Sequence, residues 1–231
     1  MSDLLHFDSL EGRYRAVCDG IARAARLAGR EPDSVQLVIA SKMQSAGSIE
    51  TLIQLGHRIF GENRVQEAHE KWDVLKARYP DVRLHLIGPL QTNKAKDAVR
   101  LFDVIETIDR DRLAVTLAAE QARQGKQLRY MIEVNIAGEP QKAGVLPEDT
   151  RALLDRCRAV HKLEIDGLMC IPPAGQQASP YFALLAQIAG DLKLPQLSMG
   201  MTADYPLAVQ LGATHVRVGT AIFGPRAAAK I

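Results

Sequence analysis

Residues 35–42 read Val-Gln-Leu-Val-Ile-Ala-Ser-Lys, an apolar and partly β-branched run that ends abruptly on Lys42. A run of this length predicts a strand that is buried on both faces, as in a parallel sheet. Folds of the α/β class place their chemistry at the carboxyl ends of such strands. An amine at that position is partly desolvated and nucleophilic toward carbonyls. Lys42 is therefore a candidate functional residue, with a surface lysine just beyond a strand end as the alternative.

Similar apolar runs recur along the chain and alternate with segments of helical periodicity. Further strands are predicted within residues 57–60, 83–88, 104–105, 128–135, 163–168, 196–199 and 214–218. Helices are predicted over residues 10–28, 49–55, 64–79, 94–99, 110–124, 147–160, 180–192 and 202–211. Eight strands alternating with helices, with one extra helix at the N-terminal end, predict a single-domain (β/α)8 barrel of the α/β class. A doubly wound open sheet is the alternative, but no GxGxxG motif follows the first strand.

The length of 231 residues fits this prediction, because α/β barrels of roughly 200–250 residues fold as one unit. We find no long linker, no internal repeat and no low-complexity tract, so one domain is predicted over residues 1–231. Three polar residues are predicted to cap helices: Asn63 (paired with Gln66), Asp109 and Thr202.

The composition excludes several classes of protein. Lys and Arg number 29 and Asp and Glu number 27, so the net charge of +2 gives no argument for binding to nucleic acid or to a membrane surface. No apolar run approaches the ~20 residues of a membrane span. Residues 1–8 lack the features of a signal peptide. Three widely spaced cysteines without a CxxC motif predict free thiols, and together these features predict a cytoplasmic protein.

The segments that follow the seventh and eighth predicted strands contain the parts of a phosphate site. Glycines let a backbone approach an anion, and hydroxyl groups add hydrogen-bond donors. Barrels often bind phosphate with these two loops. The candidates are Ser198, Gly200, Thr202, Gly219 and Thr220. Ordinary turns are the alternative interpretation of each loop taken alone.

Arg217 lies inside the apolar eighth strand, where a charge needs a partner. A structural ion pair with a neighbouring carboxylate is one interpretation. Taken with Lys42 and the phosphate loops, however, Arg217 fits a phosphorylated aldehyde, which indicates pyridoxal 5'-phosphate (PLP) joined to Lys42 as a Schiff base. A Schiff-base aldolase is the alternative that uses a lysine and a phosphate site on this fold.

Other catalytic motifs do not compete with this interpretation. The six histidines form no HExxH motif or Cys/His cluster, so no metal site is predicted. No GxSxG motif is present. His85, in the third predicted strand, could face the mouth of the barrel, but a hydrogen-bonded core histidine is favoured.

Several stretches, spread in order over nearly the whole chain, closely resemble the pyridoxal phosphate homeostasis proteins (the YggS or proline synthetase co-transcribed family). The resemblance implies a barrel related to the N-terminal domain of alanine racemase. The matching stretches are Ala40-Ser-Lys42, Phe60-Gly-Glu-Asn63, Val65-Gln-Glu67, His85-Leu-Ile-Gly-Pro-Leu-Gln-Thr-Asn-Lys94, Val134-Asn-Ile136, Gly167-Leu-Met169, Ile171-Pro172, Leu197-Ser-Met-Gly-Met201 and Val216-Arg-Val-Gly-Thr-Ala-Ile-Phe-Gly224.

The resemblance also implies roles for individual residues. Lys42 would carry the cofactor, Arg217 would face the pyridine nitrogen, and Asn63 would lie by the ring. Lys142 matches a lysine near the site mouth. Phosphate contacts would come from Ser198, Gly200, Gly219 and Thr220.

The sequence departs from the family pattern at a few positions. Arg64 stands where the family usually has Tyr, and it adds a charge near the mouth that could attract an anionic ligand. Gln141 replaces a Ser before Lys142, and Thr202-Ala203 replaces Ser-Asp. Thr202 keeps a hydroxyl group, so it stays a candidate for phosphate binding.

The resemblance implies a PLP-binding protein that acts in PLP homeostasis and affects amino acid and keto acid pools, without an assigned reaction. PLP-requiring apo-enzymes are possible partners, and a monomer is expected. The alternative is a PLP-dependent enzyme such as an amino acid racemase, which needs a second acid/base opposite the lysine. An interaction module without a cofactor would not explain the set of lysine, arginine and glycine residues.

Overall fold

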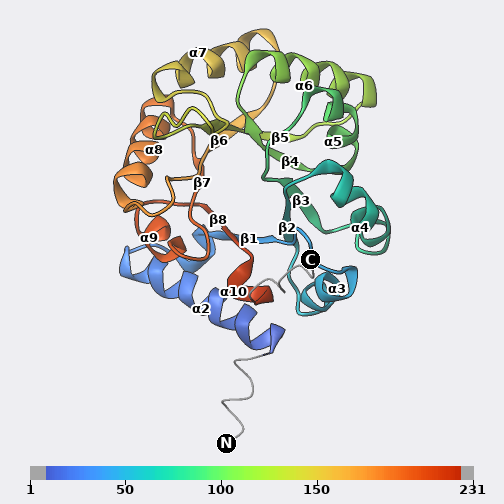
Figure 1. The fold of residues 1–231 in the computed structure, drawn as a ribbon, viewed down its shortest axis with the longest axis vertical. Coiled ribbons are helices and arrows are strands. Elements are labelled where there is room, and N and C mark those ends of the chain that lie inside the picture. Colours follow the sequence, from blue (N-terminus) through green and yellow to red (C-terminus); the bar gives the residue numbers. More distant parts are fainter. Residues whose placement is uncertain (1–8, 225–231) are drawn as a thin grey trace, which may run out of the picture.

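A closed barrel of eight parallel strands forms the centre of the molecule, and neighbouring strands pair in the order of the sequence (Figure 1). The computed structural model describes residues 9–224. The strands are β1 (Gln36–Ala40), β2 (Ile59–Glu62), β3 (Arg83–Leu86), β4 (Val104–Ile108), β5 (Arg129–Val134), β6 (Ile165–Cys170), β7 (Gln196–Ser198) and β8 (His215–Val218). The predicted barrel is confirmed and the open sheet is excluded.

Helices surround the barrel on its outer side (Figure 1). They are α2 (Leu10–Leu27), α3 (Ala46–Gln54), α4 (Val65–Arg78), α5 (Ala95–Leu101), α6 (Asp111–Gln124), α7 (Thr150–Asp155, continued by a π-helix over Arg156–Val160), α8 (Ser179–Leu192), α9 (Tyr205–Gln210) and α10 (Thr220–Phe223). The predicted extra helix is α2, which packs against α9 and α10. No helix between residues 9 and 224 is long and apolar enough to cross a lipid bilayer.

Two predictions extend into residues that the structure does not describe. Residues 1–8, which lack signal-peptide features, lie outside the described range, and so do both ends of the predicted 1–231 domain. Those two statements therefore stay predictions. Cys18, Cys157 and Cys170 all lie within the described range and are free thiols.

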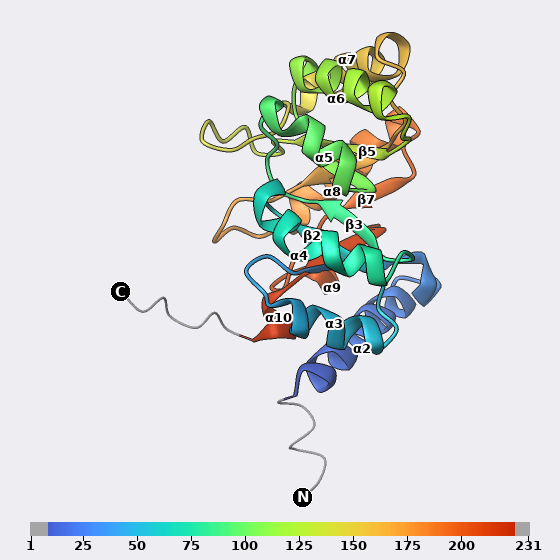
Figure 2. The same cartoon turned by 90° about the vertical axis from the view of Figure 1, so that its right-hand side faces the viewer.

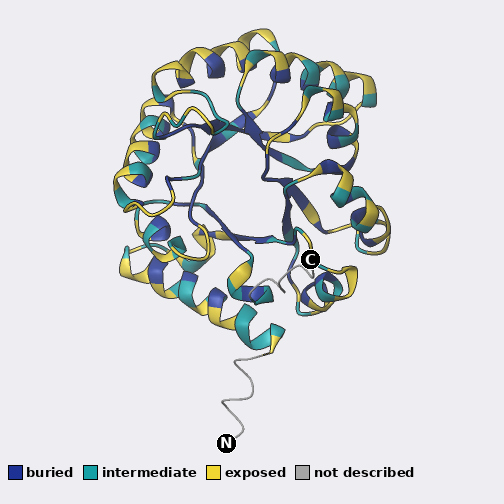
Figure 3. Ribbon diagram, in the orientation of Figure 1, coloured by how far each residue is buried: buried dark blue, intermediate teal, exposed yellow. Residues whose placement is uncertain are grey.

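The strands are the most deeply buried part of the fold, and the outer surfaces of the helices are exposed (Figure 3). Val38 and Ile39, neighbours in β1, are both fully buried, so the strand is covered on both faces as its composition predicted. β1 closes the barrel by pairing with both β2 and β8. Because these strands are parallel, the turn after β1 lies beside the loop after β8.

All three predicted caps are wrong. The N-cap of α4 is Arg64, that of α6 is Arg110 and that of α9 is Asp204, and none of them makes a side-chain cap hydrogen bond. The Asn63 carbonyl packs closely against the loop after β3, where a Cβ on Gly88 would lie 2.4 Å from it.

The other two predicted caps have different partners. The Asp109 carboxylate forms an ion pair with Arg110. The Thr202 hydroxyl oxygen accepts a hydrogen bond from the backbone of Ala221 at 3.3 Å. In both cases the side chain that was predicted to cap a helix makes a different contact near the rim of the barrel.

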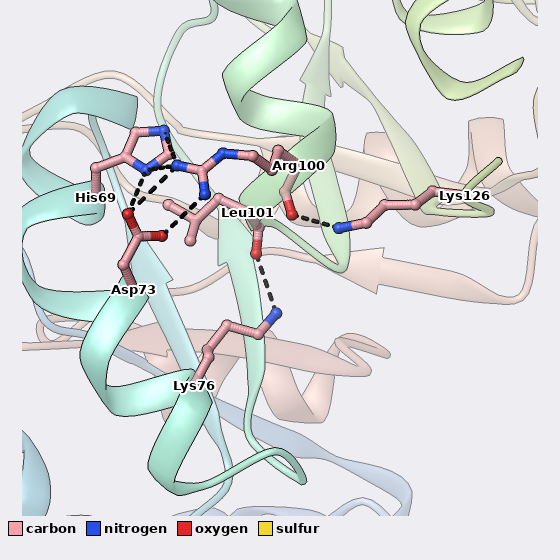
Figure 4. Close-up of polar contacts among 6 residues, drawn as sticks. All are labelled: His69, Asp73, Lys76, Arg100, Leu101 and Lys126. Carbon is pink, nitrogen blue, oxygen red and sulfur yellow. Dashed lines mark hydrogen bonds and ion pairs between the residues drawn. The ribbon is translucent and has the colours of Figure 1, made fainter. Parts of the chain in front are cut away.

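Neighbouring helices are joined by side chains that reach the carboxyl end of α5 (Figure 4). Lys76 of α4 donates to the carbonyl of Leu101 at 3.0 Å, and Lys126 donates to the carbonyl of Arg100. The Arg100 guanidinium in turn donates to Asp73 of α4 at 3.3 Å. These ammonium groups satisfy carbonyls that lack partners within the helix, which stabilises the outer ring of helices.

Candidate functional site

The loops that follow the strands gather at one end of the barrel. Figure 2 shows the long loops after β5 and β6 projecting from the same side. Lys42 lies at this end, two residues beyond β1. It lines a pocket of about 290 Å³ together with Thr202, Arg217, Gly219 and Thr220. The structure therefore brings together candidates from three loops and from β8.

The turn that contains Lys42 is held by hydrogen bonds from β2 and α4. Lys71 donates to the carbonyl of Ser41 at 3.0 Å, and the Ser41 hydroxyl donates to the Glu62 carboxylate at 2.8 Å. The backbone N–H of Met43 donates to Glu67. Met43 has a φ of 60°, which a side-chain-bearing residue adopts only when its surroundings hold it there.

The Lys42 side chain is half-buried. Within residues 9–224 its amine has neither a hydrogen-bond partner nor an ion-pair partner. Lys71 and Glu67, two charged residues that contact the turn, are used to fix its backbone at Ser41 and Met43. The amine is therefore available to a ligand.

Arg217 is the second cation of the pocket, and hydrogen bonds to residues of β6 and β7 fix its guanidinium. It donates to the Ser198 hydroxyl oxygen at 2.7 Å and to the carbonyl of Cys170 at 2.8 Å. The Ser198 hydroxyl donates to Glu106 at 2.5 Å. The sequence left open a direct ion pair between Arg217 and a carboxylate. In the described chain Ser198 instead bridges the two charges.

Glu106 is fully buried inside the barrel and also receives a hydrogen bond from His85 at 2.6 Å. Burial would raise the pKa of Glu106, but the hydrogen bond from His85 and the nearby charge of Arg217 lower it to about 2. Burial lowers the pKa of His215 to about 4, so that ring is neutral at pH 7. Glu106 is therefore the carboxylate that balances Arg217. The interpretation of His85 as a hydrogen-bonded core histidine is confirmed.

We expect Glu106→Gln to lower the free energy of unfolding at pH 7 by about 3 kcal/mol, because it leaves the Arg217 charge buried without a balancing carboxylate. The lowered pKa means that this contribution is present above the usual pKa of 4.5 and is lost as the pH falls toward 2. Urea denaturation measures the change. Glu70→Gln, at an exposed position on α4, is the control and should stay within about 0.5 kcal/mol. A Glu106→Gln value as small as the control would contradict this role.

Three predicted site residues lie outside the lining of the Lys42 pocket. Ser198 is fully buried and uses its hydroxyl to join Glu106 and Arg217. Gly200 has a φ of 91°, and a Cβ there would lie 2.5 Å from the Cβ of Ala208. Its carbonyl accepts a hydrogen bond from the backbone of Arg217 at 2.9 Å. Asn63 lines a separate pocket farther around the rim.

Lys142 bridges the two long loops seen in Figure 2. Its amine forms an ion pair with Glu139 and donates to the carbonyl of Pro172 at 3.1 Å. It does not line the Lys42 pocket. Its contacts indicate that it joins the loops after β5 and β6.

Sequence reasoning missed two carboxyl groups inside the barrel. The first is Glu106. The second is Glu133 of β5, whose Oε2 is buried without a hydrogen-bond partner among the described residues. Burial raises the pKa of Glu133 to about 7, and Asp109 adds to the effect while Arg217 opposes it. The sequence did contain a signal for both residues, because each glutamate interrupts an apolar strand in the same way as Arg217.

The fold and the pocket define a known class of barrel. The family "Alanine racemase, N-terminal domain" matches residues 21–227. The chain also belongs to the family of pyridoxal phosphate homeostasis proteins. Proteins of that name from Vibrio cholerae and Pseudomonas aeruginosa are 36% and 38% identical to it, over 228 and 213 residues. The alignments cover 94% and 89% of this chain and 97% and 91% of the relatives.

A solved structure of PipY from Synechococcus elongatus PCC7942, with PLP bound, is similar in both sequence and fold. It is 39% identical to this chain with a TM-score of 0.76. The match covers 88% of this chain and 100% of PipY. The family predicted from the sequence motifs is thus confirmed.

Proposed function

We propose that this protein binds PLP in the Lys42 pocket and acts in PLP homeostasis, with effects on amino acid and keto acid pools. One observation carries the proposal: the partner-free amine of Lys42 and the buried guanidinium of Arg217 line the same pocket. Family membership supports it, as does the PipY structure with PLP bound.

The residues of the pocket fit this cofactor. The bound cofactor supplies an aldehyde that can condense with a lysine amine and a phosphate that needs donors. Lys42 supplies the amine. Gly219 lets the loop after β8 approach β1, since a Cβ there would lie 2.9 Å from the Ala40 carbonyl oxygen. Thr202 and Thr220 add hydroxyl groups to the same pocket.

We assign the remaining roles as follows. Arg217 donates to the pyridine nitrogen, and Gly219, Thr220 and Thr202 bind the phosphate. Ser198 acts through Arg217, because its hydroxyl is already hydrogen-bonded on both sides. Gly200 shapes the loop after β7. Asn63 approaches the ring from the next sector of the rim.

The same geometry favours a binding protein over an efficient enzyme. Arginine stays protonated and can only donate, so Arg217 favours an unprotonated pyridine nitrogen and a weaker electron sink. Two-base racemization needs a second acid/base in addition to the lysine. Among the described residues that line the Lys42 pocket there is no histidine, tyrosine, aspartate, glutamate or cysteine. Transfer of PLP to apo-enzymes, a monomeric state and a cytoplasmic location stay predictions.

Deuterium exchange at the α-carbon of L- and D-amino acids tests the proposal that the protein binds PLP without acting as an efficient enzyme. We expect the PLP-loaded protein to catalyse exchange far more slowly than about 1 per second, an ordinary enzyme turnover. The visible spectrum, recorded in parallel, reports whether the cofactor is bound. A loaded protein that exchanges at 1 per second or faster would restore the racemase-like alternative. A protein that takes up no PLP would overturn the proposed function itself.

A further inference from the structure

A second pocket, larger than the Lys42 pocket, lies on the same end of the barrel. Its volume is about 720 Å³, within the range of sites for small organic ligands. It is formed by the segments that follow β2, β3 and β4, whereas the Lys42 pocket lies over β1, β7 and β8. The two pockets have no lining residue in common.

The charged side chains that line this second pocket are all positive. Arg64, Lys94 and Arg110 line it, and no aspartate or glutamate does. The side chains of Arg64 and Lys94 have no hydrogen-bond or ion-pair partner in the part of the chain that the structure describes. Two cations that face one pocket without a carboxylate between them favour an anion in that pocket.

Arg110 is fixed at the wall of the pocket. It forms an ion pair with Asp109 and donates to the carbonyl of Leu90 at 3.1 Å and to the Thr92 hydroxyl at 3.3 Å. These contacts tie the segments after β3 and β4 together. Arg64 and Lys94 are therefore the charges that remain for a ligand.

The start of α4 adds donors to the same pocket. Val65 and Gln66, the first residues of the helix, line it, and the N-cap residue Arg64 makes no side-chain cap hydrogen bond. The first N–H groups of a helix have no acceptor within the helix. Glu67, the acidic residue of this turn, is used elsewhere, because it accepts from Met43 and pairs with Lys71. Pro89 and Leu90 supply an apolar side for the body of a ligand.

We propose that this pocket binds the anionic group, phosphate or carboxylate, of a small organic molecule, with Arg64 and Lys94 as its charged contacts. A pocket of this volume fits a small organic molecule. Asn63 lines the pocket and is also the residue we expect beside the PLP ring. The pocket shares no lining residue with the Lys42 pocket, so a ligand there would leave the proposed phosphate site free.

The test is a titration of the full-length protein with phenyl phosphate and, separately, with benzoate, followed by calorimetry. The cofactor pocket is first filled with PLP, which is fixed with borohydride so that the probes cannot use it. We expect at least one probe to bind, and the Arg64→Gln/Lys94→Gln double variant to bind it at least about tenfold more weakly. The control is Lys96→Gln, an exposed lysine on α5 outside the pocket, which should bind like the parent.

The two probes distinguish the sources of the anion. Tighter binding of phenyl phosphate assigns a phosphorylated ligand, and tighter binding of benzoate assigns a carboxylate. The inference is overturned if neither probe binds, or if the double variant binds as tightly as the parent. If the protein takes up no PLP, the proposed function fails, and the same titration of the unfilled protein and its variants still tests this pocket.

Discussion

Borohydride reduction of the PLP-loaded protein is expected to place the cofactor on Lys42, and Lys42→Ala is expected to lose covalent labelling completely. The amine of Lys42 has no competing partner among residues 9–224, and its turn is fixed by Lys71 and Glu67. Because the backbone of this turn is fixed, it needs no rearrangement for the free amine to reach a bound aldehyde. Peptide mapping by mass spectrometry locates the label, and the visible spectrum reports its loss in the variant.

Lys142→Ala is the matched control for this experiment. Lys142 also lies at the loop end of the barrel, but Glu139 and the carbonyl of Pro172 hold its amine. We expect its replacement to leave the label on Lys42 at the parent level. Normal labelling in Lys42→Ala would contradict our assignment, and a label found on Lys142 would transfer the role to that lysine.

The barrel and the position of Lys42 could be predicted because both depend on local pattern. An apolar run of five to eight residues has to be buried, and a parallel sheet with helices outside buries both of its faces. The sequence 35–42 carries that pattern and β1 occupies its centre. Lys42 then follows the strand by two residues, so its place at the loop end required no knowledge of distant contacts.

The hydrogen bonds that hold Arg217 in place could not be predicted in the same way. The Ser198 hydroxyl meets a carboxylate that lies 92 residues earlier in the chain. Side chains of a strand alternate between its two faces, so a change of register by one residue would turn a different side chain toward that carboxylate. The spacing around Ser198 is that of a phosphate loop, and only the closed barrel shows that its hydroxyl is used by Arg217 and Glu106.

Two buried glutamates turn out to support the two functional cations. Glu62 accepts hydrogen bonds from Ser41 and, at 3.0 Å, from Trp72, and so fixes the turn that carries Lys42. Glu106 balances Arg217 through Ser198. Neither carboxylate lines the Lys42 pocket. The barrel thus places negative charge behind the site and leaves positive charge facing the ligand, which favours an anionic ligand such as a phosphorylated aldehyde.

Gly219→Val is expected to weaken PLP binding by at least about a hundredfold. The φ of Gly219 is −126°, which any residue adopts, so glycine is needed here for space. A Cβ at this position would lie 2.9 Å from the Ala40 carbonyl oxygen and 3.3 Å from the Ala40 Cβ. A branched side chain would push the loop after β8 away from β1 and move its backbone donors off the phosphate. Each charge-assisted hydrogen bond lost costs about 1.5–3 kcal/mol, and two such losses exceed a hundredfold in affinity.

The measurement is equilibrium dialysis of PLP against the parent and the variants, with circular dichroism to confirm that each is folded. Gly190→Val is the matched control, because a Cβ at that exposed position on α8 meets no atom within 4 Å. Gly219→Ala, with less bulk, should lie between the parent and Gly219→Val and keeps the test informative if the valine variant does not fold. PLP affinity equal to the parent's in either Gly219 variant would show that this loop does not bind the phosphate. A graded loss would instead support binding of the phosphate by the backbone of Gly219 and Thr220.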